Sequence, residues 1–97
     1  MFLKSLFKKP FPFSENPKTA VFVCCHIAGR SADILNVTHD LDGDWQFLCG
    51  KTHSASDGRI ASLEEVFRLD PTVGKIADLQ NGRSAERKTY KAEWVIK

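Results

Sequence analysis

LNVTHDLDGDWQFLC, residues 35–49, holds two runs of alternating apolar and polar side chains on either side of Asp42-Gly43. Alternation with a period of two is typical of a strand with one wet face. Because Gly43 tolerates a positive φ, it suits a tight turn between two such runs. This stretch predicts an antiparallel β-hairpin with strands over residues 33–39 and 45–49.

Two more strands are predicted outside the hairpin. Residues 20–25 are apolar at every position, which is the pattern of an interior strand covered on both faces. Residues 89–97 alternate apolar and polar side chains and predict a long C-terminal strand with one wet face. Residues 51–59 are rich in Ser, Gly and His, and predict a loop.

Two consecutive short helices are predicted between the hairpin and the C-terminal strand. Ser62 and Glu65 have the spacing of a capping box, which begins a helix. That helix must end by Asp70, because Pro71 disfavours helical geometry in the residue before it. Asp70 as N-cap and Pro71 at the first helical position then begin a second helix, which Gly82 follows as a C-terminal stop.

The order of these elements predicts an α+β domain. Its sheet is expected to be antiparallel or mixed, with about four strands and with the two helices between the third and the last. The chain has 97 residues, which favours one domain, expected over residues 20–97. Residues 1–19 are expected to form a basic N-terminal arm, which contains three prolines and ends in a linker over residues 10–19.

Charge and hydropathy exclude several classes of partner. The net charge of +2 comes from lysines in the arm, so the body lacks the basic surface that binds nucleic acid. No run of about 20 apolar residues is present to span a membrane. Residues 2–9 place apolar side chains beside lysines, but so short a segment is not expected to hold the chain stably at a membrane.

The cysteines indicate a reducing compartment. Three thiols, two of them adjacent, do not make a disulfide framework, so we expect a cytoplasmic protein. Because Cys24 and Cys25 should point to opposite faces of a strand, they cannot share one ion without distortion, and we expect all three thiols to pack in the core without a metal or cofactor. The residues of a type that binds zinc are Cys24, Cys25, His26, His39, Cys49 and His53.

No motif of catalysis or ion binding is complete. Asp40, Asp42 and Asp44 alternate as in a calcium loop, but Trp45 and Lys51 stand where that loop requires Gly and Glu. The chain lacks a nucleophile elbow and a Gly-rich cofactor loop. We therefore expect a protein that is not an enzyme.

Four segments in order resemble a bacterial family, domain-of-unknown-function family 2185, grouped with the predicted immunity proteins of polymorphic toxin systems. They are Asp42-Gly43-Asp44-Trp45-Gln46-Phe47-Leu48-Cys49-Gly50, Ser62-Leu63-Glu64-Glu65-Val66, Leu69-Asp70-Pro71-Thr72-Val73 and Gly82-Arg83-Ser84-Ala85-Glu86-Arg87. The resemblance implies a cytosolic protein that neutralises a cognate toxin by stoichiometric binding. This sequence differs from the family at Asp44, where the family tends to have Gly, and at Lys51, where the family tends to have an acidic residue. No catalytic residue transfers.

A toxin-binding surface needs charged or aromatic anchors on a rigid scaffold. Two alternatives to an immunity protein stay open: a stand-alone regulatory or scaffold module, and a small zinc or thiol enzyme. A homodimer through an exposed edge strand is also compatible with the sequence. The candidate partner-binding residues lie in the hairpin turn and in the long loop: Asp40, Asp42, Asp44, His53, Asp57 and Arg59.

Overall fold

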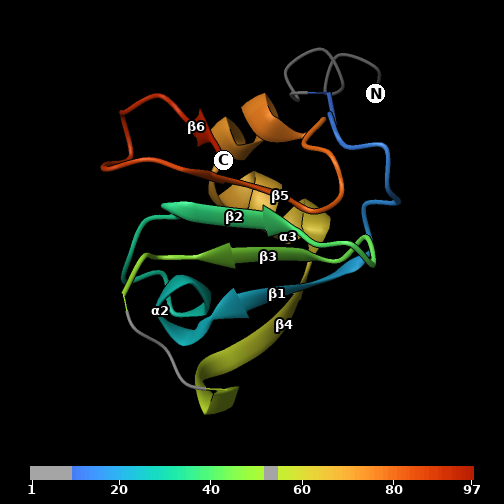
Figure 1. The fold of residues 1–97 in the computed structure, drawn as a ribbon. Helices are drawn as coiled ribbons and strands as arrows, with labels where there is room; N and C mark the ends of the chain where they lie inside the picture. Colours follow the sequence, from blue (N-terminus) through green and yellow to red (C-terminus); the bar gives the residue numbers. More distant parts are fainter. Residues whose placement is uncertain (1–9, 52–54) are drawn as a thin grey trace, which may run out of the picture.

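The computed structural model describes residues 10–51 and 55–97, and its strands form one mixed sheet (Figure 1). The strands are β1 (Ala20–Cys24), β2 (Asn36–His39), β3 (Trp45–Leu48), β4 (Gly58–Ser62), β5 (Arg83–Glu86) and β6 (Val95–Ile96), in the order β4-β1-β3-β2-β5-β6. The helices are α2 (Cys25–Ala28), α3 (Leu63–Leu69) and the 3₁₀ segments η1 (Ala55–Asp57) and η2 (Pro71–Ile76). The α+β class is confirmed, but the sheet has six strands in the described part of the chain, not about four.

The predicted hairpin is confirmed. Strands β2 and β3 pair antiparallel, with Val37 opposite Phe47. Gly43 has a φ of +89°, as the tight turn requires. The side chain of Asp40 closes the turn, because its Oδ1 accepts hydrogen bonds from the amides of Asp42 and Asp44 at 2.9 and 3.0 Å.

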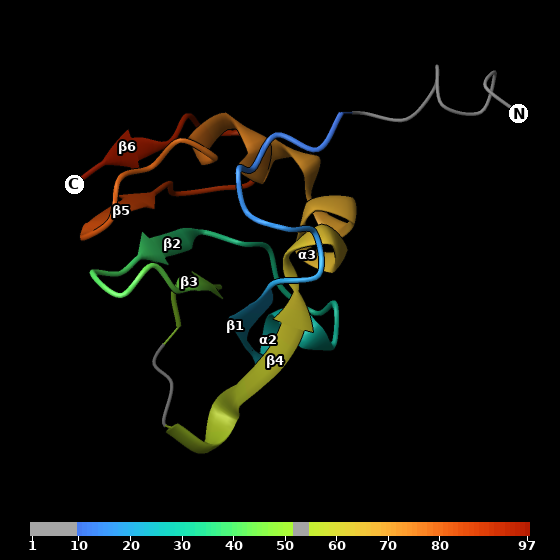
Figure 2. The same cartoon turned by 90° about the vertical axis from the view of Figure 1, so that its right-hand side faces the viewer.

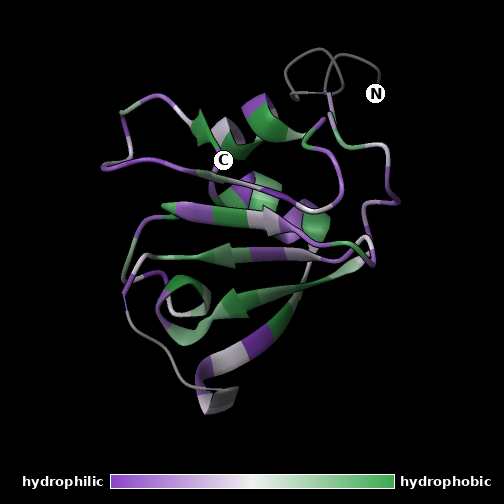
Figure 3. Ribbon diagram, viewed as in Figure 1, coloured by the Kyte–Doolittle hydropathy of each residue, from purple (hydrophilic) through white to green (hydrophobic). Residues whose placement is uncertain are grey.

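Strand β1 is interior, as predicted, but it is not covered on both faces. It lies between β4 and β3 and runs parallel to β3, with Phe22 opposite Gln46. Figure 3 shows that β1 is hydrophobic along nearly its whole length. Val21 and Val23 point into the core, whereas Phe22 is 47% exposed. The helices α3 and η2 cover one side of the sheet only (Figure 2), and Phe22 lies on the other side.

Two strands form where the sequence predicts none, and one predicted strand is mostly absent. Gly58 and Arg59 were expected to end the loop over residues 51–59, and Ser62 to begin a helix, but residues 58–62 pair with all of β1 as β4. Strand β5 contains only one apolar side chain, Ala85, and forms because its backbone pairs with β2. Of residues 89–97, only Val95–Ile96 is a strand, and the centre of the Trp94 ring lies 4.0 Å from the guanidinium carbon of Arg87.

Both predicted helix starts are confirmed. Glu65 donates its amide to Ser62 Oγ at 3.1 Å and accepts the amide of Ser62 on Oε1 at 2.8 Å, so the capping box is complete. Asp70 caps the next segment by accepting the amide of Thr72 at 3.0 Å. That segment, η2, is a 3₁₀ helix and not an α-helix.

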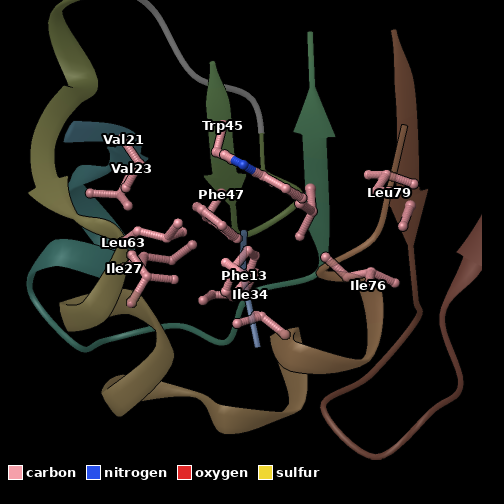
Figure 4. Packing of buried hydrophobic residues seen from close by; sticks show 14 of the residues in the cluster. Phe13, Val21, Val23, Ile27, Ile34, Trp45, Phe47, Leu63, Ile76 and Leu79 are labelled. Carbon is pink, nitrogen blue, oxygen red and sulfur yellow. The ribbon is translucent and has the colours of Figure 1, made fainter. Parts of the chain in front are cut away.

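The core lies between the sheet and the helices (Figure 4). Its largest fully buried side chain is Trp45, which packs edge-to-face with Phe13 at a centroid distance of 5.2 Å. Phe13 is only 5% exposed, although it lies in the predicted linker. The second half of the predicted arm therefore packs on the domain, where Pro17 and Thr19 accept backbone hydrogen bonds from α3 at 2.9 Å each. Residues 1–9 lie outside the described part of the chain.

Candidate functional site

The three aspartates of the hairpin turn lie at one end of the sheet. Asp42 and Asp44 are exposed, so their carboxylates are available to a partner. Asp40 is partly buried, and its Oδ1 already accepts two amides of the turn. Only two of the three predicted anchors therefore present an uncommitted carboxylate, and they stand at the tip of the hairpin.

Asp57 and Arg59 lie at the opposite end of the sheet. Gly58 pairs with Cys24, the last residue of β1, whereas the hairpin turn precedes Trp45, the first residue of the parallel strand β3. Arg59 is exposed, and its Nη1 donates to the carbonyls of residues 56 and 58 at 3.2 and 2.9 Å. Asp57 is partly buried. The structure therefore does not bring the two groups of predicted anchors together, and the remaining one, His53, lies outside the described residues.

An exposed apolar pair lies on the open face of the sheet. Phe22 on β1 stands directly opposite Ile60 on β4, and the two side chains are 47% and 63% exposed. On the other side of Phe22 the neighbour is Gln46, which is exposed and polar. Strand β4 is also an edge of the sheet, so one row of its backbone amides and carbonyls faces away from β1.

The sequence did not reveal this pair, because Phe22 was expected to be covered and Ile60 was next to a predicted loop. The signal that was available is the unbroken apolar run of β1. An apolar run in a small sheet with helices on one side only must leave alternate side chains in solvent. Phe22 and Ile60 are thus two neighbouring apolar side chains left in solvent on one face of the sheet.

A cluster of two thiols and one imidazole lies where β1 and β3 end. Cys24 is the last residue of β1, His26 lies in the short helix α2, and Cys49 directly follows β3. Their Sγ and ring nitrogen atoms lie within 4.8 Å of one another, and Cys49 Sγ is 3.6 Å from His26 Nδ1. Cys25 is not part of the cluster, and it is the first residue of α2, whereas it was expected to be the last residue of the strand.

The Cys49 thiol is a weak acid in this environment. Burial raises its pKa above the usual value, and the neighbouring Cys24 side chain raises it further. A hydrogen bond to the backbone of Lys51 opposes the shift in pKa without cancelling it. The protonated thiol therefore dominates at neutral pH, and a thiol in that form is a poor nucleophile.

The remaining histidine of the described chain, His39, has a structural position. Its ring stacks on Trp45 at a centroid distance of 4.0 Å, and its Nδ1 donates to the carbonyl of Leu79 at 2.6 Å. Glu15 lies on the other side, where Oε2 accepts from Trp45 Nε1 at 2.9 Å and lies 3.4 Å from His39 Nε2. His39 therefore joins the N-terminal segment to the core and is not near the thiols.

A second buried polar group is also structural. Arg87 forms a 2.7 Å ion pair with Asp70, and both side chains are buried. Its other guanidinium nitrogens donate to the Ile34 carbonyl and the Thr72 hydroxyl, and Trp94 packs on its face. Because every donor of the guanidinium that faces the core has a partner, this network joins β5 to the helices and does not present a binding group.

In the described residues, none of the helices combines the length and the apolar character needed to cross a membrane. Comparisons of the chain with protein-family models, with curated proteins and with solved structures found no match.

Proposed function

We propose that this protein is a non-enzymatic binding module of the bacterial cytoplasm, an immunity protein that neutralises a cognate protein toxin by stoichiometric binding. The observation that carries the proposal is the exposed pair Phe22–Ile60 beside the open edge of β4. The resemblance to predicted immunity proteins supplies the class of partner. No catalytic group is needed for this role, because a partner is blocked by occupancy alone.

The apolar pair has the energetic weight of a binding anchor. Complete burial of a Phe or Ile side chain contributes about 1.5–3 kcal/mol, so covering the half-exposed pair would contribute about 2–3 kcal/mol in total. By the usual relation between free energy and affinity, this is about a 30- to 150-fold effect on the dissociation constant. The free backbone groups of β4 add hydrogen bonds for an extended segment of the partner.

Two of the predicted charged anchors lie on or beside β4. Arg59 belongs to the same strand as Ile60 and is exposed, and Asp57 directly precedes the strand. The carboxylates of Asp42 and Asp44 lie beyond the other end of the strands. Arg59 stands opposite Val23, whose side chain points into the core, so Arg59 leaves the sheet on the face opposite to Phe22 and Ile60. A partner centred on that pair therefore reaches Arg59 only around the edge of β4, and reaches the hairpin tip only if it spans the length of the sheet.

A regulatory or scaffold module would use the same surface with a different class of partner. Co-expression with the product of the neighbouring gene separates these two possibilities. Protection of the host cell is expected from an immunity protein and not from a scaffold.

The test uses substitutions on the open face. Phe22→Gln and Ile60→Gln are each expected to weaken the complex about 10-fold and to reduce protection in parallel, because about half of the pair's apolar area is lost in each. Arg59→Glu, on the other face of β4, is expected to have a smaller effect. The double variant Asp42→Lys/Asp44→Lys, at the far end of the sheet, is the matched control and is expected to bind normally. Circular dichroism establishes that each variant folds.

Two results would contradict the proposal. The first result is that the neighbouring protein is harmless when it is expressed alone. The second result is that protection persists without a detectable complex between the two proteins. If the hairpin variant abolishes binding while Phe22→Gln and Ile60→Gln do not, the immunity role stands but the contact surface is the hairpin tip.

A further inference from the structure

The Cys24, His26 and Cys49 side chains have the spacing of metal ligands. A zinc ion binds thiolate sulfur at about 2.3 Å and imidazole nitrogen at about 2.0–2.1 Å in tetrahedral geometry. Those lengths require about 3.6 Å between a ligand sulfur and a ligand nitrogen, and about 3.8 Å between two sulfurs. The observed distance between Cys49 Sγ and His26 Nδ1 is 3.6 Å, and all three atoms lie within 4.8 Å of one another.

We propose that Cys24, His26 and Cys49 form a zinc-binding site with three protein ligands. Two thiols and one imidazole are the ligand types that select zinc over the hard cations magnesium and calcium. Three protein ligands leave a fourth position of the tetrahedron for water or another donor. This inference does not depend on the identity of the toxin or on the proposed contact surface.

The fold explains how the three ligands meet. Strands β1 and β3 are parallel neighbours, and Val23 pairs with Phe47, so the residues that follow each strand lie at the same end of the sheet. The chain then enters α2 directly after Cys24, and the change from strand to helix returns His26 to the side of the two thiols while Cys25 stays outside. Strand alternation separates Cys24 from Cys25, but it does not separate Cys24 from His26, because a helix begins at Cys25.

Burial and charge are also compatible with zinc. Cys24 and Cys49 are 1% and 4% exposed, whereas His26 is only partly buried and leaves an approach from the surface. Two thiolates and one Zn²⁺ sum to zero net charge, so the occupied site introduces no uncompensated charge into the core. Zinc binding must displace the thiol protons, as at other cysteine sites.

The experiment uses the full chain, purified without air, stripped of metal with a chelator and titrated with Zn²⁺ or Co²⁺. Native mass spectrometry is expected to show one zinc per chain. Cobalt is expected to produce the visible absorption of a tetrahedral ion together with thiolate-to-cobalt charge transfer. Zinc is expected to raise the midpoint of thermal unfolding by several degrees, because it binds the folded chain better than the unfolded one.

Three variants locate the site. His26→Ala changes a partly exposed residue and is expected to keep the fold, but to weaken zinc binding by more than the roughly 10- to 100-fold that follows loss of an outer-shell partner. Cys49→Ser is expected to remove the charge-transfer band contributed by its sulfur. Cys25→Ser is the matched control, a neighbouring thiol outside the cluster, and is expected to bind zinc normally.

Either of two outcomes would overturn the site. One outcome is that the reduced wild-type chain fails to retain zinc. The other is that the chain binds zinc with an affinity that His26→Ala and Cys49→Ser do not change. If Cys49→Ser fails to fold, as a change in the core can cause, His26→Ala still decides the question. A loss of zinc binding in Cys25→Ser with normal binding in His26→Ala would also refute the proposed ligand set.

Discussion

Replacing Arg87 with methionine tests the buried ion pair that joins β5 to the helices. In the native chain, the guanidinium donates to Asp70 Oδ2 at 2.7 Å, to the Thr72 hydroxyl at 2.8 Å and twice to the Ile34 carbonyl at 2.9 and 3.0 Å. Methionine has a similar length and keeps the packing on Trp94, but it removes every one of these donors. Arg87→Met therefore isolates the polar contribution.

The expected loss follows from what the substitution leaves behind. Removing one partner of a buried ion pair destabilises a protein by about 3–5 kcal/mol, because the other charge stays buried without compensation. Asp70 keeps its hydrogen bonds from the Thr72 amide and hydroxyl, so the expected loss in the free energy of unfolding is about 3 kcal/mol, at the lower end of that range. For a domain of this size, each kcal/mol lowers the midpoint of thermal unfolding by about 4–8 °C. The expected decrease is thus about 12–24 °C.

The assay is urea unfolding followed by far-ultraviolet circular dichroism. Circular dichroism is preferable to tryptophan fluorescence here, because Trp94 contacts the substituted side chain. The midpoint is expected to fall while the slope of free energy against urea stays constant. The double variant Asp70→Asn/Arg87→Met is the control: Asn still caps η2, and the buried charge is gone, so it is expected to be more stable than Arg87→Met alone.

Two results would refute this reasoning. A loss below about 1 kcal/mol in Arg87→Met would place the ion pair among those that contribute little. The second result concerns the double variant. If its loss of stability equals the sum of the losses in the single variants Asp70→Asn and Arg87→Met, the two side chains do not interact energetically.

Two further predictions concern the N-terminal segment and the capping box, and each is tested by two variants. Phe13→Ala is expected to lower the free energy of unfolding by about 3–5 kcal/mol, because a buried aromatic side chain that packs against Trp45 is lost. Deletion of residues 1–17 removes the same side chain and is expected to lower the free energy of unfolding at least as much. Urea unfolding measures both losses. Ser62→Ala is expected to lower it by about 0.5–2 kcal/mol through loss of the N-cap. Hydrogen bonds from the backbone and side chain of Ser62 lower the pKa of Glu65 below its ordinary value of 4.5 in the folded state, so the stabilisation by Glu65 is present above pH 4.5 and is lost as the pH falls through the folded-state pKa. Stability measured between neutral pH and pH 3 is therefore expected to fall less in Glu65→Gln than in the wild type.

Controls for these two predictions lie in the same elements. Ser14→Ala changes an exposed residue beside Phe13 and is expected to leave stability unchanged; a domain that unfolds normally after deletion of residues 1–17 would contradict the buried role of Phe13. Glu64→Gln changes the neighbouring carboxylate, which is not part of the capping box. If Glu65→Gln and Glu64→Gln have the same pH dependence, the capping hydrogen bonds do not explain the shift in pKa.

The sequence was sufficient for elements that depend on neighbouring residues. The β2–β3 hairpin follows from the alternation of apolar and polar side chains and from Gly43, because the turn needs a positive φ at that position. The starts of α3 and η2 follow from side chains that bond to amides two or three positions away, as Ser62 and Asp70 do. These interactions form within one turn of chain, so their residues are visible as short patterns.

Other parts of the fold depend on partners that are distant in the chain. Strand β5 has almost no apolar side chains and exists because β2 supplies a backbone ladder. Residues 89–97 alternate as a strand should, but only Val95–Ile96 pairs with β5, while the Trp94 ring packs on the Arg87 guanidinium. No local pattern reports either event, because the energy comes from contacts made after the chain has folded.

The candidate sites show the same division. The sequence identified Asp42, Asp44 and Arg59 as polar residues in exposed segments, but their positions at opposite ends of the sheet follow from the direction and register of the strands. Exposure of Phe22 depends on helices covering one face of the sheet only. The cluster of Cys49 with Cys24 and His26 depends on the parallel pairing of β1 and β3. Residue type and local conformation are written in the chain, whereas exposure and proximity are properties of the neighbours that the tertiary structure brings together.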